Sequence, residues 1–187
     1  MTPMTRLSRS WTKRFRASRL NRVPSPALAV STPWLSILLA ALLPSMPVIA
    51  SAPVLPPLGL LLLLAWRQVR PGVLPVWAGL PLGAFDDLFS GQPFGSAILL
   101  WSLAMIALDA IEARFPWRSY WLDWLAAAGL ICVCQALALF FANAAGGAAE
   151  LSVIVPQLAT AILLYPLAGR LVSSLDRLRL TPIVELD

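Results

Sequence analysis

Long apolar stretches separated by short polar segments dominate the chain, and this pattern predicts membrane-spanning helices. A window of about 19 residues places apolar runs over residues 27–50, 51–66, 71–85, 94–111, 124–141 and 151–167. The first run is expected to bend near Pro44 and Pro47. The second and third are short, because a helix of about fifteen residues rises only about 22 Å, so we expect the third to continue through Phe89. The pattern predicts an all-α, polytopic membrane helical bundle of about six transmembrane helices.

The positions of the basic residues predict the orientation of these spans. With six spans and the N-terminus inside, all 14 Lys and Arg fall in the N-terminal tail, the loops after the second and fourth spans, and the C-terminal segment. The loops on the other side then carry no Lys or Arg, and their charged residues are Asp86, Asp87 and Glu150, so the positive-inside rule is satisfied. We therefore expect a multi-pass inner-membrane protein with both termini in the cytoplasm. It would consist of a basic tail (1–26), a membrane helical bundle (27–172) and a C-terminal tail (173–187).

Composition supports lipid as the solvent and disfavours metal or thiol chemistry. The chain is 59% hydrophobic and 12% charged, with a mean hydropathy of +0.78, which is too apolar for a soluble domain of this length. It has no histidine, and its two cysteines, Cys132 and Cys134, lie within an apolar run. On a helix, side chains two residues apart point in different directions and do not bridge. We expect packing roles for both, with no cofactor and no metal site.

The N-terminal tail is strongly basic and has no acidic residue. Such a segment is attracted to an anionic inner leaflet, by about 1 kcal/mol for each basic residue near the surface. Leu7, Trp11 and Phe15 recur every four residues and would suit a short amphipathic helix at the interface. A disordered orientation signal is the interpretation we favour, and a cytoplasmic partner is a third. The residues expected to contact the membrane surface are Arg6, Arg9, Lys13, Arg14, Arg16, Arg19 and Arg22.

The basic tail, the first apolar run and Ala50-Ser51-Ala52 together imitate a secretory signal peptide with its cleavage site. The basic region is longer than usual for such a peptide, and the prolines and further spans suit a retained helix better. We therefore favour retention of the first span. Cleavage would leave the orientation of the other five unchanged.

The stretch from Gly83 to Gly95 holds two carboxylates at the end of a span, followed by a turn rich in Ser, Gly and Pro. Adjacent side chains on a helix point about 100° apart, so one Asp can face the bundle while the other faces water. We expect Asp87 to be an inward structural or partner-binding anchor, and residues 91–95 to form a tight turn into the fourth span. The candidate residues are Gly83, Asp86, Asp87, Leu88, Ser90, Gly91, Pro93 and Gly95.

Other polar residues occur within or beside the apolar runs. Asp109 and Glu112 would share a helix face, which is repulsive unless a cation such as Arg114, or an arginine of another loop, joins them. Four further polar side chains in or near the last two spans could hydrogen-bond between helices or line a substrate pocket, and sequence does not separate these roles. They are Gln135, Asn143, Gln157 and Tyr165.

The segment Asp87-Leu88-Phe89-Ser90-Gly91-Gln92-Pro93-Phe94-Gly95 resembles the signature region of the rod shape-determining protein MreD family. The end of the last span, Leu164-Tyr165-Pro166-Leu167 followed by Arg170, is also similar to the closing helix of that family. The long arginine-rich N-terminus and the doubled Asp depart from the family pattern. Asp87, directly before Leu88, is the better match to the family's single acidic position.

The resemblance implies a non-enzymatic membrane component of the elongation (rod) complex, which maintains cell shape by organising lateral peptidoglycan synthesis in bacteria. It implies contact with membrane lipid and an MreC-like bitopic protein. It also implies contact, direct or indirect, with an MreB-like filament, a RodA-like glycosyltransferase and a penicillin-binding transpeptidase, but with no nucleic acid. The implied fold is similar to the substrate-binding subunits of energy-coupling-factor transporters.

Two other classes of function compete with a scaffold. A small-molecule-binding subunit of a transporter could hold an uncharged ligand between the third, fourth and sixth spans, where Pro81 and Pro156 would break helices. A membrane enzyme is the weaker alternative, because it needs a nucleophile with a base or a metal-binding acidic cluster. Asp86 and Asp87 alone do not supply either.

Overall fold

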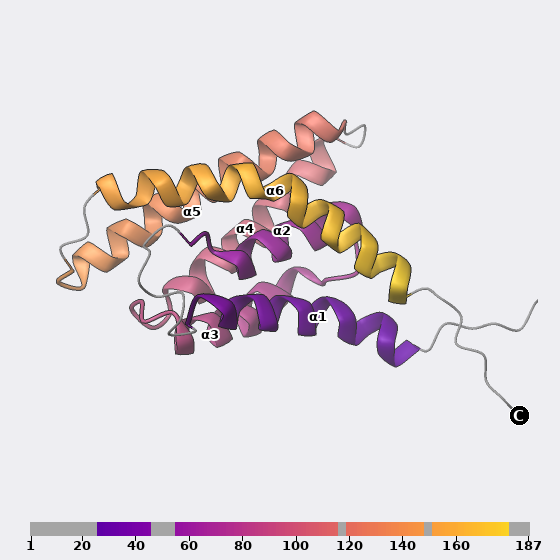
Figure 1. Ribbon diagram of the computed structural model, residues 1–187, viewed down its shortest axis with the longest axis horizontal. Helices are drawn as coiled ribbons and strands as arrows, with labels where there is room; N and C mark the ends of the chain where they lie inside the picture. Colours follow the sequence, from indigo (N-terminus) through magenta and orange to yellow (C-terminus); the bar gives the residue numbers. More distant parts are fainter. Residues whose placement is uncertain (1–25, 46–54, 116–118, 148–150, 180–187) are drawn as a thin grey trace, which may run out of the picture.

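The computed structural model describes residues 26–45, 55–115, 119–147 and 151–179, and within these ranges every regular element is a helix (Figure 1). The all-α prediction is therefore confirmed for this part of the chain. The elements in order are α1 (Pro26–Leu42), η1 (Leu43–Ser45), α2 (Leu58–Val69), η2 (Val76–Ala78), α3 (Gly79–Phe89), α4 (Ser96–Arg114), α5 (Tyr120–Ala144) and α6 (Leu151–Arg179).

Among the helices of the described ranges, three are long and apolar enough to cross a membrane, namely α4, α5 and the part of α6 from Ile154 to Arg179. The apolar stretches of α1 and α2 are shorter. Large apolar side chains cover the outside of the long helices: Leu163 is 76% exposed, and Leu125, Phe140 and Val155 are each more than half exposed. A soluble protein does not present such a surface to water. The fold is that of a helical membrane protein.

Two helix boundaries differ from the sequence prediction in an informative way. Helix α1 ends at Leu42 and passes into the 3₁₀ turn η1 at Pro44, whereas Pro47 and residues 50–52 lie outside the described part of the chain. Helix α6 continues to Arg179, well beyond residue 167, where the apolar run ends, and into the segment expected to be a tail. Its last turns are amphipathic, so hydropathy alone ends the helix too early.

Helix α2 is the centre of the bundle. Figure 1 shows α1 and α6 along two sides of the molecule with α2 and α4 between them. Every residue of α2 from Gly59 to Arg67 is buried, which is the pattern of a helix surrounded by protein on all sides. Its 12 residues would span only about 18 Å. A short helix is tolerated at membrane depth because neighbouring helices, not lipid, surround its ends.

Polar side chains fix α2 to its neighbours. The indole Nε1 of Trp66 donates a hydrogen bond to Oγ of Ser36 on α1, at 2.8 Å. Gln68 accepts one from the Tyr165 hydroxyl of α6 at 2.5 Å and donates one to the Asp123 carbonyl of α5 at 3.0 Å. Of the two roles that the sequence left open for Tyr165, the structure shows the interhelical bond, and the same residue also lines a cavity. These bonds set the register of α2 against three other helices.

Two glycines allow α3 to lie directly against the backbone of α4. A Cβ added to Gly83 would come 2.6 Å from the carbonyl oxygen of Ala97, and one added to Gly79 would come 2.7 Å from that of Trp101. The spacing Gly79-x-x-x-Gly83 places both on one helix face, as in the small-residue interfaces of membrane helices. This close packing holds the end of α3 beside the start of α4.

We predict that Gly83→Ala destabilises the protein, because the added methyl group meets the α4 backbone, which cannot move without separating the two helices. Overpacking of this kind costs about 1–3 kcal/mol. The measurement is the midpoint of thermal unfolding of the detergent-purified protein. Gly129→Ala is the matched control, since Gly129 lies in α5 with no atom within 4 Å of an added Cβ. An equal midpoint for the two variants would contradict the packing described.

Candidate functional site

The Asp87 side chain joins the end of α3 to the start of α4. Its Oδ2 accepts hydrogen bonds from the backbone N–H groups of Gly95, at 2.9 Å, and Ile98, at 3.1 Å. Its Oδ1 accepts one from the N–H of Ala97 at 2.8 Å and one from the Ser96 hydroxyl at 3.3 Å. Asp87 is 6% exposed, so its inward orientation is confirmed. Asp87 therefore acts as an N-cap for α4, although it comes from another helix.

The cap leaves no N–H of the first turn of α4 without an acceptor. Ser96 N–H donates to the Pro93 carbonyl and Leu99 N–H to the Gly95 carbonyl, while Asp87 serves those between them. A helix begins with four such groups that its own carbonyls cannot serve, and its positive end favours a carboxylate. Capping is thus the function of Asp87 that the geometry demonstrates, and it leaves the carboxylate engaged on both oxygens.

The segment from Ser90 to Gly95 forms the tight turn that the sequence predicts. Ser90 caps the end of α3, and Gly91 and Gly95 have φ values of +68° and +99°. Glycine adopts this left-handed region at little cost, whereas other residues are strained there. Gly95 is the residue directly before α4, so its conformation brings the backbone N–H groups around to face Asp87.

Three apolar side chains of the motif region point outward. Leu88 is 67% exposed, Phe94 is 72% exposed, and Phe89 is 46% exposed. They surround the turn, and Phe89 also packs against the Phe85 ring at 4.9 Å between centroids. Leu88 is among the candidate residues predicted from the sequence, whereas Phe89 and Phe94 are not. The sequence signal that could have identified them as exposed residues is their position on either side of the Ser-Gly turn.

The Asp86 side chain is partly buried. It lines a small cavity of about 40 Å³ together with Gln92 and Gln135. The amide Nε2 of Gln135 is buried and has no hydrogen-bond partner in the described part of the chain. The cavity is large enough for a water molecule, which would give this amide an acceptor. It is far smaller than the roughly 300–1,000 Å³ of a typical ligand pocket.

At the other end of α4, a buried arginine joins two carboxylates. Nη2 of Arg67 lies 2.5 Å from Oδ1 of Asp109 and 3.0 Å from Oε2 of Glu112. The Arg67 side chain is 6% exposed, while that of Asp109 is 55% exposed. The prediction that a cation joins Asp109 and Glu112 is confirmed, and of the two sources considered it is the arginine from another segment, not Arg114.

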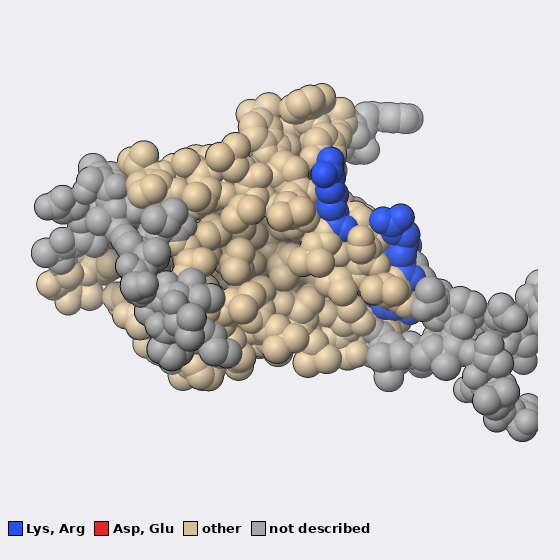
Figure 2. Space-filling view, viewed as in Figure 1, with Lys and Arg blue, Asp and Glu red and all other residues tan. Residues whose placement is uncertain are grey.

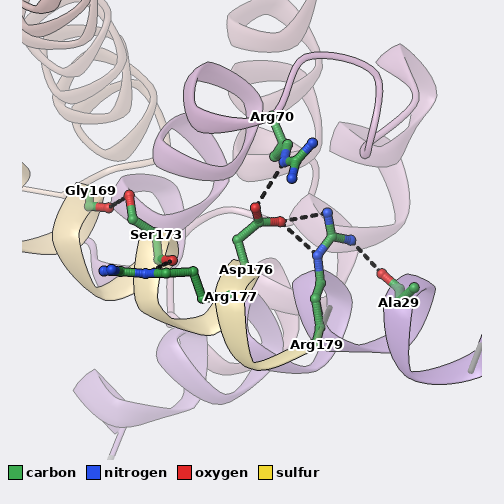
Figure 3. A network of polar contacts seen from close by, with 7 residues as sticks. All are labelled: Ala29, Arg70, Gly169, Ser173, Asp176, Arg177 and Arg179. Atoms are coloured by element: carbon green, nitrogen blue, oxygen red, sulfur yellow. Dashed lines mark hydrogen bonds and ion pairs between the residues drawn. The ribbon is translucent and has the colours of Figure 1, made fainter. Parts of the chain in front are cut away.

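A second ion cluster was not predicted from sequence. Oδ2 of Asp176 accepts a bond from Arg70 at 2.8 Å and its Oδ1 pairs with Arg179 at 2.6 Å (Figure 3). Arg179 also donates to the Ala29 carbonyl at 2.5 Å and lies over the Trp66 ring. The available signal was the i, i+3 spacing of Asp176 and Arg179 on a helix that continues past the apolar run.

These two clusters bring five helix ends together. They join the start of α1 to the ends of α2, α4 and α6. The start of α5 lies beside them, because Gln68 at the end of α2 donates to the Asp123 carbonyl. We call this the arginine end of the bundle, defined by Arg67, Arg70 and Arg179. The turn capped by Asp87 joins the end of α3 to the opposite end of α4. Helices α2 and α4 therefore run toward the arginine end, whereas α1 and α5 run away from it.

Some residues singled out in the sequence lie outside the described part of the chain. These are the seven basic residues of the N-terminal tail and Arg118. Cys132 and Cys134 are both free. Within the described ranges, no three His, Cys, Asp or Glu residues come close enough together to hold a metal ion.

Comparisons with protein-family models, with curated proteins and with solved structures find no match to this chain. The geometry described above is therefore the basis for a functional proposal, together with the sequence motif around Asp87.

We predict that Asp87→Ala lowers the free energy of unfolding by about 2 kcal/mol, because it leaves N–H groups at the start of α4 without an acceptor. Asp87→Asn keeps one acceptor oxygen and should lose less. The measurement is thermal unfolding in detergent. Asp86→Ala is the matched control, because Asp86 makes no side-chain hydrogen bond to the start of α4. A larger loss for Asp86→Ala than for Asp87→Ala would contradict the capping role.

We also predict that Arg67→Met destabilises the protein, because Asp109 and Glu112 then repel each other without a cation between them. The expected loss is about 1–3 kcal/mol, which is below that of a fully buried pair because Asp109 is half exposed. Adding Glu112→Gln to Arg67→Met should recover part of the loss in the same unfolding experiment. Independent, additive effects of the two substitutions would contradict the coupling.

Proposed function

We propose that this protein is a non-enzymatic scaffold of the bacterial elongation (rod) complex, similar to the MreD family, which organises lateral peptidoglycan synthesis. The observation that carries the proposal is the role of Asp87. The residue that matches the family's acidic position is used to cap α4 and to shape the Ser-Gly turn. An anchor of this kind presents a surface, whereas a catalytic carboxylate needs a free oxygen.

The surface in question is the turn between α3 and α4. Leu88, Phe89 and Phe94 are exposed around a backbone that Asp87, Gly91 and Gly95 hold in one conformation. Exposed aromatic side chains on a rigid support are suited to protein contacts. An MreC-like bitopic protein is the partner we propose for this surface. The MreB-like filament, the RodA-like glycosyltransferase and the penicillin-binding transpeptidase would join directly or through it.

The same proposal includes the location and topology. The protein would be a multi-pass inner-membrane protein with about six spans, with the arginine end in the cytoplasm and the Asp87 turn on the outer side. The paired arginines at one end and the acidic turn at the other support this orientation. The alternative, a small-molecule-binding subunit of a transporter, is less well supported. The cavity beside the turn holds only about 40 Å³, and the larger cavity, of about 670 Å³, is lined by α2, α5 and α6 and not by the third, fourth and sixth spans, where that alternative expected the ligand.

We predict that depletion of the protein converts rod-shaped cells of its host to round cells, because lateral wall synthesis loses its organiser. Cell width measured by microscopy is the readout. Wild-type protein should restore the rod shape, whereas Leu88→Ala with Phe94→Ala should not, although the protein still accumulates in the membrane. Leu125→Ala with Leu163→Ala, two changes on the long exposed helices, is the matched control and should restore it.

A photo-crosslinking amino acid at Phe94 should capture the MreC-like protein, and one at Leu163 should not. Cells that remain rod-shaped after depletion, or equal capture from both positions, would contradict the proposal.

A further inference from the structure

A second, larger cavity lies at the arginine end, between the end of α2, the first turns of α5 and the C-terminal half of α6. Its volume is about 670 Å³, within the range of ligand pockets. The lining includes Gln68, Tyr120, Trp124, Arg170, Ser173 and Arg177. None of these residues belongs to the turn proposed to bind a partner, so the cavity requires its own explanation.

Two arginines of this lining have guanidinium groups that pair with no carboxylate among the described residues. In the described part of the chain, the guanidinium of Arg170 makes no hydrogen bond or ion pair, and that of Arg177 bonds only to the Ser173 carbonyl of its own helix, at 3.2 Å. Figure 3 shows Arg177 directed away from the Asp176 cluster. By contrast, Arg67, Arg70 and Arg179 are each paired with a carboxylate.

The spacing along α6 places both arginines on one face. Residues 170, 173, 174 and 177 follow the i, i+3, i+4, i+7 pattern of a helix stripe, so two hydroxyl groups lie between the two guanidinium groups. Figure 2 shows two separate groups of blue side chains over the C-terminal half of α6, on a face that is otherwise almost entirely tan or grey. Asp123 is the acid in the lining. Two arginines against one carboxylate leave the lining with a net positive charge.

The rim of the cavity has the character of a membrane interface. Tyr120 is 64% exposed, and its ring contacts that of Trp121, which in turn contacts Trp124. Tyrosine and tryptophan are enriched at the level of lipid headgroups. Leu167 and Leu171, on either side of Arg170, are at least half exposed. A cationic, hydroxyl-lined cavity thus opens beside an apolar surface.

We propose that this cavity binds the phosphate group of an anionic membrane lipid, whose acyl chains lie along the exposed face of α6. Arginine binds phosphate oxygens through paired N–H donors. The Ser173 and Ser174 hydroxyls between the two guanidinium groups donate to the Gly169 and Arg170 carbonyls of their own helix, so each would have to rotate to donate to a phosphate oxygen. Basic pockets between membrane helices are a known means of binding anionic headgroups. A free phosphate ion would use the same donors but would gain nothing from the aromatic rim and the leucines.

The test measures phosphatidylglycerol binding to the full-length, detergent-purified protein by native mass spectrometry. We expect phosphatidylglycerol to bind, and phosphatidylcholine, whose headgroup has no net charge, to bind about tenfold more weakly. The double variant Arg170→Gln with Arg177→Gln should bind phosphatidylglycerol about tenfold more weakly than wild type. Arg114→Gln is the matched control, because Arg114 ends α4 outside the cavity, and it should bind like wild type.

A variant with the opposite expected sign separates binding from folding. Asp123→Asn removes the negative charge from the lining, so it should strengthen phosphatidylglycerol binding, which a folding defect does not do. Inorganic phosphate at millimolar concentration should not displace the lipid. The proposal is overturned if the double variant binds phosphatidylglycerol as wild type does, if phosphatidylcholine binds equally well, if Asp123→Asn weakens binding, or if inorganic phosphate displaces the lipid, which would identify a soluble-anion site.

Discussion

Ion pairs between arginine and carboxylate hold one end of this bundle together, and the positions of most helices depend on them. Arg67 links α2 to α4, and Asp176 links α2 to α6 through Arg70. Buried charges are costly unless they are paired. The side chains of Arg67, Asp176 and Arg179 are at most 10% exposed, so these three groups favour the helix arrangement that brings their partners to them. Arg179 extends the same constraint to α1 through the Ala29 carbonyl. The ion pairs thereby fix the C-terminal end of the central helix α2. The apolar remainder of α2 is buried by packing against the neighbouring helices.

The opposite end is organised by a single carboxylate. Asp87 satisfies the first turn of α4, and the close contact of Gly83 with Ala97 keeps α3 near enough for this to happen. Charged groups thus lie near the ends, where water and headgroups can reach them, and the length between is apolar. The two ends also differ in chemistry. One offers a rigid turn with exposed aromatic side chains, and the other a cationic cavity with an aromatic rim.

Three features were predictable because each depends on a pattern within one short segment of sequence. They are the helical class, the short second and third helices, and the inward orientation of one carboxylate. Apolar runs predict helices, and adjacent Asp86 and Asp87 cannot both face the same way. The cation between Asp109 and Glu112 was predictable as a requirement, but its identity was not, because Arg67 is distant in sequence. The Asp176 cluster and the length of α6 were missed because an amphipathic helix end carries no hydropathy signal. The cavity between α2, α5 and α6 depends on how the helices pack, which no single segment encodes.

In the proposed orientation the arginine end faces the cytoplasm and the Asp87 turn faces the outside. Cysteine labelling tests this directly in a variant whose native Cys132 and Cys134 are replaced by Ala. A single cysteine at Gln92, which is exposed in the turn, should react with a membrane-impermeant maleimide in intact spheroplasts. One at Arg114, exposed at the end of α4, should react only after permeabilisation. Labelling of the Arg114 position in intact spheroplasts would contradict the orientation, and with it the proposed positions of both the partner surface and the lipid site.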